Sequence, residues 1–445
     1  MTTHQTHAHA PDIRAGRLEP EHYARNFSEA VAPLSAGQAV LEAERCLYCF
    51  DAPCATACPT SIDVPSFIKR IGDGNLRGAA QAILEPNPLG GMCARVCPTE
   101  NLCEAVCVRN TQEERPVAIG RLQRYAVDAL LASAQPQLFT RAAATGKKVA
   151  VLGAGPAGLS CAHRLARLGH QVQVFDARPK PGGLNEYGLA RYKMADAYAE
   201  QEIHWLLDIG GIEIQQNWQL DSLAQLQALR KDFDAVFLAL GLGHTKTLGI
   251  PGEDLQGVQD AVDFIATLRQ TEDLAQLPVG RRVIVIGGGM TAVDVAVQNK
   301  LLGASVVHMV YRRGPEHMSA SREEQHWAQT HGVVLHHGLV PQEIVGHNGQ
   351  VQAVRFVQTQ SGREICWDAD TVFKAIGQTL GNPVLAASGL RMQGERIATD
   401  SVGQTSLPGV WAGGDCRAGG QALTVDAVAH GQQSAHAIHA HLGAQ

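Results

Sequence analysis

Short apolar runs followed by glycines are the clearest hydrophobic pattern along the chain, and they occur twice. Residues 149–152 and 282–286 are rich in valine, isoleucine and leucine, and each run leads into a glycine turn and an apolar helical pattern. Runs of this length between such signals predict buried strands. Further apolar runs at 172–175 and 305–311 follow the two predicted helices. Each half therefore predicts a strand, helix and strand of a parallel sheet.

The closing strands of the two halves show how the halves are connected. Residues 234–241 come before the second glycine turn and residues 370–377 come after it, and both begin with Asp and end with Gly around an apolar run. An apolar strand at 409–412, the pair Gly414-Asp415 and a last helical pattern end the chain. We therefore expect one α/β unit to be inserted into the other.

A different pattern precedes both halves. Apolar positions recur at intervals of three and four within residues 64–84 and 119–131, which predicts amphipathic helices. Residues 132–145 contain glutamine, proline and small residues and are expected to form a linker. The chain is thus predicted to begin with a small helical domain.

Composition and charge narrow the classes of function. The chain has 445 residues, of which 45% are hydrophobic, enough for two or three domains. Its net charge of −6 provides no broad basic field, so neither nucleic acid nor a membrane surface is an expected partner. No apolar stretch approaches the roughly 18 residues that span a bilayer, and the first residues lack the pattern of a secretion signal. We expect a cytoplasmic protein.

Eight of the eleven cysteines lie between Cys46 and Cys107, in two groups of four. In a reducing cytoplasm this density indicates metal rather than disulfides. Each group contains one cysteine directly before a proline, as in ferredoxin-like [4Fe-4S] sites, where that cysteine serves the other cluster. We therefore expect two interleaved groups around two clusters. Zinc is the alternative, but it favours two Cys-x-x-Cys pairs, and only Cys46 and Cys49 have that spacing.

The first glycine turn has the spacing of a dinucleotide-binding loop. Gly153 is expected to make the tight turn, Gly155 to let the backbone approach a pyrophosphate, and Gly158 to let the helix pack closely on its strand. The next strand ends at Asp176, whose carboxylate can accept hydrogen bonds from ribose hydroxyls. Residues 181–184, Pro-Gly-Gly-Leu, form a further glycine turn of the kind that lies against FAD.

The second glycine turn, at residues 287–292, implies a second dinucleotide. Its second strand ends in Arg312 and Arg313 instead of an acid, so guanidinium groups are available for an adenosine 2'-phosphate, although both can also be solvated surface residues. No Cys-x-x-Cys follows in this half, so a redox disulfide beside the flavin is not expected. Cys161 and Cys366 are expected to be buried small hydrophobic residues.

In order and spacing, these motifs resemble the flavin subunit of glutamate synthase and the N-terminal half of dihydropyrimidine dehydrogenase. The second resemblance is closer, particularly to the small subunit of the bacterial NAD-dependent enzymes. It is carried by residues 45–54, 87–90, 119–123 and 421–428. Gln123 is the most telling position, because a glutamine there is a cluster ligand in the dihydropyrimidine dehydrogenase family.

The resemblance implies the ligands of both clusters. One cluster takes Cys46, Cys49, Cys54 and Cys107, and the other takes Cys58, Cys97, Cys103 and Gln123. Cys93 is then a spare thiol. Because thiolate is the commoner ligand, Cys93 in place of Gln123 stays open.

The same resemblance and the glycine motifs together give the nucleotide-binding residues; no other catalytic residue is expected. For FAD these are Ala154, Gly155, Pro156, Ala157, Gly158, Asp176, Gly182, Gly183, Leu184, Lys193, Leu220, Gly414, Asp415 and Thr424. For NAD(P) they are Gly287, Gly288, Gly289, Met290, Thr291, Arg312, Arg313, Ala375, Ile376 and Gly377. NAD(H) is preferred because Ser319 stands where the mammalian pattern has an arginine, while Arg312 and Arg313 keep NADP(H) open.

The expected fold class is α/β: a helical double [4Fe-4S] domain followed by two nested Rossmann-like domains. The expected boundaries are 1–145 for the iron–sulfur domain, 146–250 with 385–445 for FAD, and 251–384 for NAD(P). By resemblance, the pyrimidine site belongs to a partner subunit with FMN and iron–sulfur centres in a hetero-oligomer. The alternatives are a glutamate synthase small subunit and a general electron-transfer flavoprotein.

Overall fold

The computed structural model describes residues 18–195 and 197–443, and the His-rich N-terminal segment lies outside them. The chain divides into two compact units. The main unit contains residues 31–186, 197–244 and 379–443 of this described part, and the inserted unit contains residues 18–30, 187–195 and 245–378. The inserted unit thus interrupts the main one, as the paired closing strands predict.

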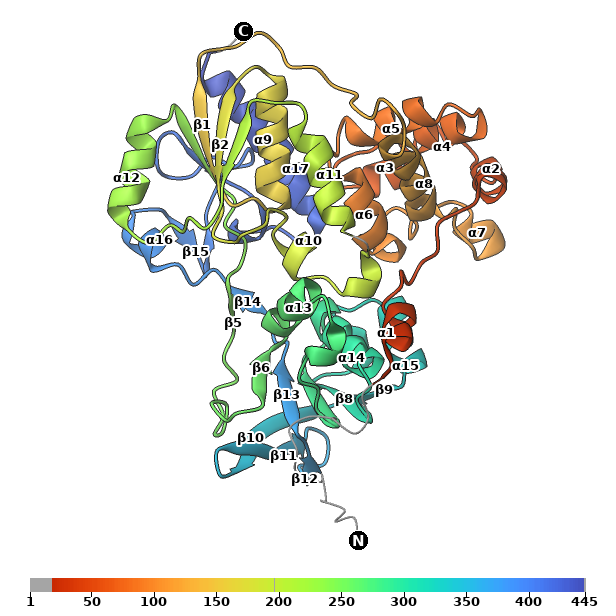
Figure 1. The fold of residues 1–445 in the computed structure, drawn as a ribbon, viewed down its shortest axis with the longest axis vertical. Helices are drawn as coiled ribbons and strands as arrows, with labels where there is room; N and C mark the ends of the chain where they lie inside the picture. The colour runs from red at the N-terminus through yellow and green to blue at the C-terminus, as the bar shows by residue number, and fades with distance from the viewer. Residues whose placement is uncertain (1–17, 196, 444–445) are drawn as a thin grey trace. The chain divides into compact units, whose positions relative to one another are not determined.

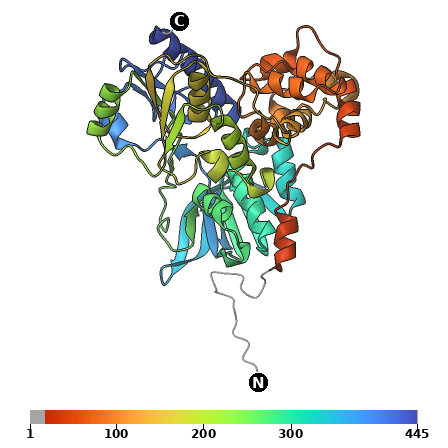
Figure 2. The same cartoon turned by 45° about the horizontal axis from the view of Figure 1, so that its top comes forward.

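The first part of the main unit is helical, and its colours run from red to orange in Figure 2. Its helices are α2 (Ala36–Glu44), α3 (Pro53–Ala57), α4 (Val64–Gly72), α5 (Leu76–Leu84), α6 (Gly90–Val96), α7 (Asn110–Glu113) and α8 (Ile119–Leu131), with a 3-10 turn η3 at Thr99–Asn101. The pattern over 64–84 is two helices rather than one, because Gly74 has a φ of 75° and Asn75 caps the second helix through Gly78. Residues 119–131 form a helix as predicted.

The second part of the main unit is a five-stranded parallel sheet in the order β17-β4-β1-β2-β3. These strands are β1 (Lys148–Leu152), β2 (Gln171–Phe175), β3 (Ile212–Gln215), β4 (Ala235–Leu238) and β17 (Val410–Ala412). The remaining elements are α9 (Pro156–Arg167), α10 (Leu184–Tyr187), α11 (Tyr198–Leu207), α12 (Leu223–Asp232), α16 (Pro383–Ala387), α17 (Thr424–His441), the 3-10 turn η7 (Gly414–Cys416), and the short strands β15 (Met392–Gln393) and β16 (Arg396–Ile397). Figure 1 shows α9 and α17 beside each other on one side of the sheet and α12 on the other.

The inserted unit repeats this plan with a parallel sheet in the order β6-β13-β7-β8-β9. Its strands are β6 (Val258–Asp260), β7 (Arg282–Ile286), β8 (Val306–Tyr311), β9 (Val333–His337) and β13 (Thr371–Lys374), and an antiparallel sheet contains β10 (Leu339–His347), β11 (Gln350–Gln358) and β12 (Glu364–Asp368). Its helices are α1 (Pro20–Asn26), α13 (Ala261–Gln270), α14 (Met290–Leu301) and α15 (Arg322–Thr330), with 3-10 turns η4 (Arg191–Lys193), η5 (Leu274–Gln276) and η6 (Pro315–His317). Where the chain passes between the units, β5 (His244–Thr245) pairs with β14 (Gln378–Thr379).

The two glycine turns pack against their closing strands in the same way. A Cβ on Gly153 would lie 2.2 Å from the carbonyl oxygen of Ala239, and a Cβ on Gly287 would lie 2.2 Å from that of Ala375. Both glycines also have positive φ angles, of 108° and 155°. A side chain is therefore excluded at the first glycine of either turn, which accounts for the repeated motif.

The predicted linker packs on the fold instead of running free. The Phe139 ring is buried, makes an edge contact of 5.7 Å with His163 and another of 6.1 Å with Trp205, and lies under the Arg167 guanidinium. The Trp205 indole N–H donates to the carbonyl of Pro136 at 2.8 Å. Residues 132–145 therefore pack on the sheet part, and the Arg77 guanidinium of α5 bonds the carbonyls of Gln135 and Gln137, so the segment contacts both parts of the main unit.

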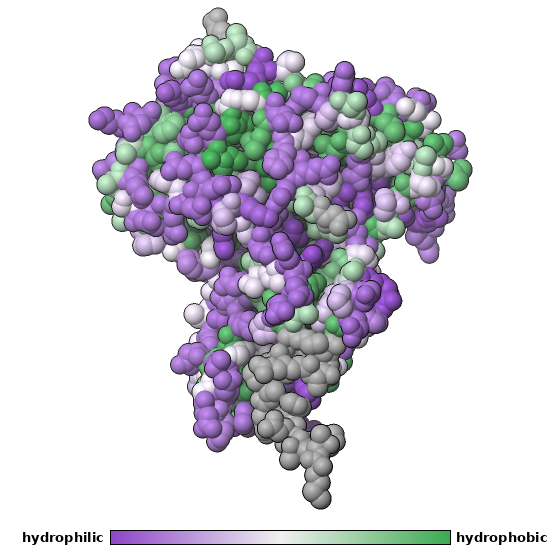
Figure 3. Space-filling view, viewed as in Figure 1, coloured by the Kyte–Doolittle hydropathy of each residue, from purple (hydrophilic) through white to green (hydrophobic). Residues whose placement is uncertain are grey.

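Hydrophilic residues cover much of the face shown in Figure 3, with hydrophobic patches between them. Within the described residues, no helix combines the length and apolar character needed to cross a membrane.

Candidate functional site

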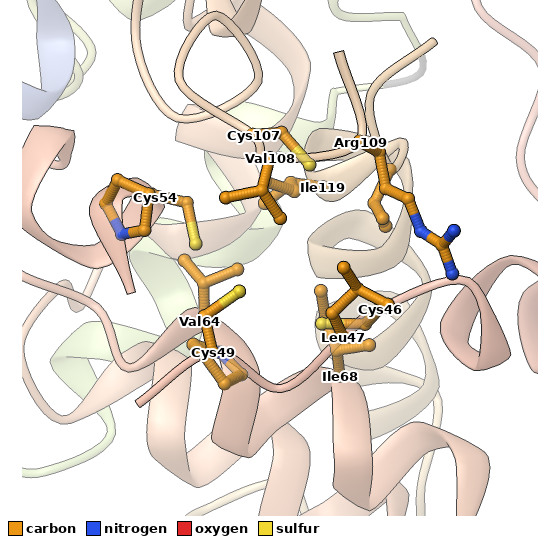
Figure 4. Close-up of a pocket in the computed structure, with 13 residues that line it drawn as sticks. Cys46, Leu47, Cys49, Cys54, Val64, Ile68, Cys107, Val108, Arg109 and Ile119 are labelled. Carbon is orange, nitrogen blue, oxygen red and sulfur yellow. The ribbon is translucent and has the colours of Figure 1, made fainter. Parts of the chain in front are cut away.

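Four cysteines of the helical part line one pocket. Cys46 and Cys49 lie in the loop after α2, Cys54 lies in α3, and Cys107 lies in the loop before α7. Figure 4 shows their sulfur atoms directed towards a common space. Most of the other lining residues are apolar: Leu47, Pro53, Val64, Pro65, Ile68, Val108, Val117 and Ile119, with Arg109. Four thiols around an apolar pocket fit the needs of a [4Fe-4S] cube, and they are the set predicted for the first cluster.

The four thiols are arranged around a pocket and do not converge on the position of a single metal ion. Among residues 18–195 and 197–443, no three His, Cys, Asp or Glu side chains come close enough together to hold a single metal ion. Burial raises the pKa of the Cys54 thiol to about 11. A metal must therefore displace this proton to obtain the thiolate ligand.

The other four cysteines of the helical part, which we call the second group, are Cys58, Cys93, Cys97 and Cys103. The Cys97 thiol, just after α6, lies close enough to the thiols of Cys93, Cys58 and Cys103 for each to raise its pKa. Cys103 is also close enough to Cys54 to interact with it electrostatically. The two groups are therefore adjacent, as the interleaved motif predicts, although their iron ligation stays a prediction.

The two candidates for the fourth ligand lie on neighbouring helices, Cys93 on α6 and Gln123 on α8. Gln123 is buried on α8, and its Nε2 donates a 2.7 Å hydrogen bond to the carbonyl of Gly90 at the start of α6. No donor among the described residues contacts its Oε1. Cys93, on α6, is 2% exposed, and its free thiol is a close neighbour of the Cys97 thiol. An oriented amide with a free oxygen fits the predicted ligand, while the Cys93–Cys97 contact keeps the alternative open.

A hydrogen-bonded chain connects the second group to the sheet part of the main unit. The Thr424 hydroxyl donates to Asn185 Oδ1 at 2.7 Å, and Asn185 Nδ2 donates to the sulfur of Met92 at 2.9 Å. Thr424 begins α17, whereas Met92 precedes Cys93 on α6. This route therefore runs from a predicted FAD residue to the second cysteine group.

Glu202 makes the second polar contact of this junction. Its carboxylate, on α11, accepts from the backbone N–H groups of Gly91 at 2.6 Å and Met92 at 2.9 Å. Burial raises the pKa of Glu202 to about 7, although these N–H groups and Arg95 act in the opposite direction. The Arg95 guanidinium also lies 3.4 Å from the ring centroid of Tyr198. The start of α6 is therefore fixed by side chains of the sheet part.

Neither Glu202 nor Asn185 is among the residues that the sequence predicts. Both lie far along the chain from their partners on α6, and neither belongs to a motif. Asn185 directly follows the Pro-Gly-Gly-Leu turn at residues 181–184. This position is the only local signal that could have identified it as a site residue.

The predicted FAD loop is built as a backbone cradle. Gly155 caps α9 at its N-terminus, and the nearest atom to a Cβ there is the Cα of Gly183, 3.7 Å away. A Cβ on Gly158 would lie 1.9 Å from the Gly153 oxygen, so close helix packing requires this glycine. Asp176 accepts the Ala154 N–H at 2.6 Å, and burial raises the pKa of this carboxyl. An open glycine at a helix N-terminus fits a pyrophosphate.

Several other predicted FAD residues meet at this loop. Pro156 and Ala157 begin α9, Leu184 begins α10, and Gly182 with Gly183 forms the adjoining turn, their φ angles being 126° and 56°. A Cβ on Gly414 would come within 2.9 Å of the Ala157 Cβ, so η7 lies against α9. Burial raises the pKa of Asp415, next in η7, to about 6.

Two predicted FAD residues lie elsewhere. Leu220 is a buried member of the hydrophobic core between the sheet and α12. Lys193 belongs to the inserted unit, where its ammonium lies 2.7 Å from Asp294 and 2.8 Å from Glu324. Burial lowers the pKa of Lys193, but the two carboxylates outweigh that effect and raise it. Within this unit the ammonium is occupied by two acids, so its role toward FAD stays a prediction.

The second glycine turn forms the corresponding cradle in the inserted unit. Gly289 caps α14, followed by Met290 and Thr291, and a Cβ on Gly289 would lie 3.0 Å from the Ser319 hydroxyl. A Cβ on Gly288 would lie 2.4 Å from the Tyr311 ring. The predicted segment 375–377 follows β13 at the carboxyl edge of the same sheet, where α/β sheets bind nucleotides.

The two arginines after β8 differ in their contacts. Arg313 donates to the hydroxyl of Tyr311 through Nη2 at 2.6 Å and Nε at 3.0 Å. Arg312 is exposed, and no group of the described part pairs with it. Arg312 is therefore available to an anionic ligand, whereas Arg313 is already oriented by a neighbour.

The isolated cysteines divide between core and surface. Cys161 and Cys416 are buried, but Cys366 is exposed on β12, so the prediction that Cys366 is buried is wrong. Its strand belongs to a three-stranded sheet with alternating exposure, and Cys366 points to the open face.

The fold and the two cradles define a flavoprotein oxidoreductase with an added cysteine-rich domain. Residues 147–431 match the family of pyridine nucleotide-disulphide oxidoreductases, and residues 23–135 match dihydropyrimidine dehydrogenase domain II, 4Fe-4S cluster. Thioredoxin reductase from T. acidophilum shares the fold, with a TM-score of 0.55 and 22% identity over 66% of this chain and 99% of that one. The α/β fold class with a helical iron–sulfur domain is therefore confirmed.

Two sets of relatives cover nearly the whole chain. NAD-dependent dihydropyrimidine dehydrogenase subunit PreT of Salmonella typhimurium is 34% identical over 96% of this chain and 98% of its own length. The glutamate synthase [NADPH] small chain of Escherichia coli is 35% identical over 93% of both chains. The chain belongs to this family of NAD(P)-dependent FAD and 4Fe-4S oxidoreductases, whose named members are subunits of larger enzymes.

Proposed function

We propose that this chain is the electron-input subunit of an NAD-dependent dihydropyrimidine dehydrogenase. It binds NAD(P)H in the inserted unit and FAD in the main unit, and it holds two [4Fe-4S] clusters with the two cysteine groups. Its partner is a subunit with FMN and iron–sulfur centres that reduces uracil or thymine. Bound FAD would accept a hydride and release its electrons singly, which matches a two-electron donor to one-electron clusters.

The observation that carries this proposal is Gln123. It is buried on α8, its amide is oriented by a hydrogen bond to Gly90 on α6, the helix that holds Cys93, and its oxygen has no donor among the described residues. A glutamine in this position is the feature that distinguishes the dihydropyrimidine dehydrogenase resemblance from the glutamate synthase one.

The residues of the chain have mainly positioning roles in this proposal. Gly155 and the α9 N-terminus hold the pyrophosphate, and Asp176 fixes the loop through Ala154. Gly289 and α14 do the same for the nicotinamide nucleotide. In this proposal, residues 146–250 with 385–445 bind FAD and residues 251–384 bind NAD(P). The segment 187–195 is an exception, because it packs with the inserted unit.

The test is cofactor analysis followed by reconstitution. Anaerobically purified chain should contain one FAD and about eight irons, and it should reduce a dye with NADH but leave thymine unchanged. Co-expression with the FMN subunit of the same organism should add NADH-dependent reduction of uracil and thymine. Thymine reduction by the chain alone would refute the division between the two subunits, and about four irons or stoichiometric zinc would refute the two clusters.

Glutamate synthase small chain is the second candidate, because the Escherichia coli relative is as similar as the Salmonella one. It predicts glutamate formation from glutamine and 2-oxoglutarate when the chain is paired with the large subunit of that enzyme. The same purified chain should be assayed with both partners, and activity with one partner alone decides between them.

The nicotinamide preference is proposed to be NAD(H). Ser319, beside Gly289, offers a hydroxyl and no positive charge. The exposed Arg312 is the group that would favour NADP(H). The ratio of kcat/KM for NADH and NADPH, measured on the parent and on Arg312→Gln, tests this choice.

A further inference from the structure

Exposed apolar side chains surround the first cysteine pocket. Phe50 is fully exposed, Leu47 is 46% exposed and Val106 is 42% exposed. Each is next in sequence to a cysteine of the pocket, and Figure 4 shows Leu47 beside Cys46. We call Leu47, Phe50 and Val106 the apolar rim. A single exposed apolar side chain is ordinary, but three beside one pocket are typical of a surface that contacts a partner.

This exposure is local rather than general. Of the eleven large hydrophobic side chains that are exposed among the described residues, seven lie between Val31 and Val106, in a helical part that is only a small fraction of the chain. Three of those seven form the apolar rim. The loop from Cys46 to Cys54 therefore differs from the rest of the described surface.

The two cysteine groups have different surroundings. The second group adjoins α6, which contacts the sheet part through Met92 and Glu202. Every residue that lines the first pocket belongs to the helical part, between Cys46 and Ile119. Electrons that enter beside Met92 would therefore leave through the first group, beneath the apolar rim.

Acidic residues lie close in sequence to the apolar rim or to the arginines beside it: Asp51 follows Phe50, Glu44 precedes Arg45, and Glu114 follows Glu113, which contacts Arg45. Glu44, Asp51 and Glu114 are exposed, and no cation of the described part pairs with them. Most of the nearby positive charge is compensated, because Arg45, Arg109 and Arg115 pair with Glu42 and Glu113, which leaves one positive charge against the three unpaired acids. The surface is thus apolar at its centre and negative at its edge. A second copy of this chain would place like charges opposite each other, which disfavours it as the occupant.

We propose that the apolar rim is the docking site of a one-electron redox protein whose contact face is apolar at the centre and basic at the edge. This inference rests on the proposed function and names the surface through which electrons leave the chain. Cytochrome c is a suitable probe, since it is a basic haem protein that accepts single electrons. The balanced reaction is NADH plus two ferric cytochromes to NAD⁺, one proton and two ferrous cytochromes.

The experiment compares a protein acceptor with a small one on the cofactor-loaded chain. Phe50→Ser combined with Val106→Ser should lower the rate of cytochrome c reduction about tenfold, since central apolar contacts dominate docking and neither side chain lines the first pocket. Ferricyanide reduction by the same variant should stay within about twofold of the parent, because a small ion needs no docking face. The matched control is Leu223→Ser, an exposed leucine on α12 that should change neither rate.

Charge is tested separately with Asp51→Lys. At low salt this variant should reduce cytochrome c more slowly than the parent, and the difference should disappear at high salt. Cytochrome c reduction that is unchanged in the rim variant while ferricyanide reduction persists would overturn the docking proposal alone. A parent that cannot reduce ferricyanide with NADH would overturn the proposed function and this inference with it. A dimer in light scattering that dissociates in the rim variant would assign the surface to a second copy instead.

Discussion

The carboxylate of Glu202 accepts a 2.6 Å hydrogen bond from the backbone N–H of Gly91, which joins the sheet part to the helical part of the main unit. Gly91 has no room for a side chain. A Cβ there would lie 1.7 Å from the Tyr198 hydroxyl and 2.8 Å from Glu202 Oε1. The junction that carries the second cysteine group therefore depends on a glycine within α6.

Gly91→Ala should weaken this junction. Because the Tyr198 ring is buried and cannot move away freely, we expect a loss of about 2 kcal/mol in stability and a lower iron content. Thermal unfolding and iron analysis of the purified protein measure both. Gly37→Ala on α2 is the control, since no atom lies within 4 Å of its new Cβ, and it should be neutral. Equal effects of the two substitutions would contradict the proposed role of the junction.

The two glycine cradles should be separable by mutation. Gly155 and Gly289 both have negative φ angles, so a valine at either position does not strain the backbone. Gly155→Val should lose FAD because its side chain fills the space between Gly155 and Gly183. Gly289→Val should keep FAD and lose NADH oxidation. Flavin absorbance and dye reduction give the two readouts, and loss of FAD from both variants would argue for general unfolding.

The two possible ligands of the second cluster, Gln123 and Cys93, lead to opposite predictions for the variants that remove them. If Gln123 is the ligand, Gln123→Ala should lose or convert that cluster and stop electron transfer to the partner, while direct reduction of a dye by the flavin continues. Cys93→Ala should then be mild. Iron counting and cluster spectroscopy on both variants decide the matter, because a full iron complement in Gln123→Ala with a damaged Cys93→Ala reverses the assignment.

Lys193→Met should separate two roles of this lysine. Removing the ammonium leaves Asp294 and Glu324 close together without their cation, so we expect a loss of about 3 kcal/mol in stability. FAD content should be unchanged if this ion pairing is its role. Retained stability together with lost FAD would instead support the predicted contact with the flavin.

His163 should make stability depend on pH. Burial lowers its pKa to about 3, with Arg167 and Arg164 adding to the effect, so the folded chain keeps the ring neutral. The unfolded chain binds a proton below about pH 6.5, and stability therefore falls as the pH drops through that value. Between pH 7.5 and 5.5 this amounts to about 1 kcal/mol. In His163→Phe, unfolding midpoints should decline less over this range, and an identical decline in variant and parent would contradict the assignment.

The sequence was sufficient for the fold because local signals and global arrangement agree. The runs that end at Gly153 and Gly287 become the central strands of two sheets with matching orders. Three thiols of the first cysteine set, Cys46, Cys49 and Cys54, are close in sequence, and the fold of the helical part brings Cys107 to them. These features depend on spacing along the chain, and spacing can be read from the order of the amino acids alone.

What the sequence could not supply depends on contacts between distant segments. Glu202 has no motif, and its partner Gly91 lies on another helix. Lys193 looks like a neighbour of the flavin loop in sequence, yet it packs with Asp294 in the inserted unit. Cys366 was expected in a core, and only the pairing of β11 with β12 reveals its open face.

The order of strands also bears on synthesis at the ribosome. Two late elements, β17 and α17, pack on much earlier ones: β17 pairs with β4, and α17 packs on α9. The helical part and the whole inserted unit are translated earlier and can begin to fold first. The flavin sheet gains its edge strand only when residues 410–441 emerge. The predicted FAD cradle therefore cannot be complete before residues 410–441 have been made, whereas the cysteine groups lie in a part of the chain that is made before the sheet.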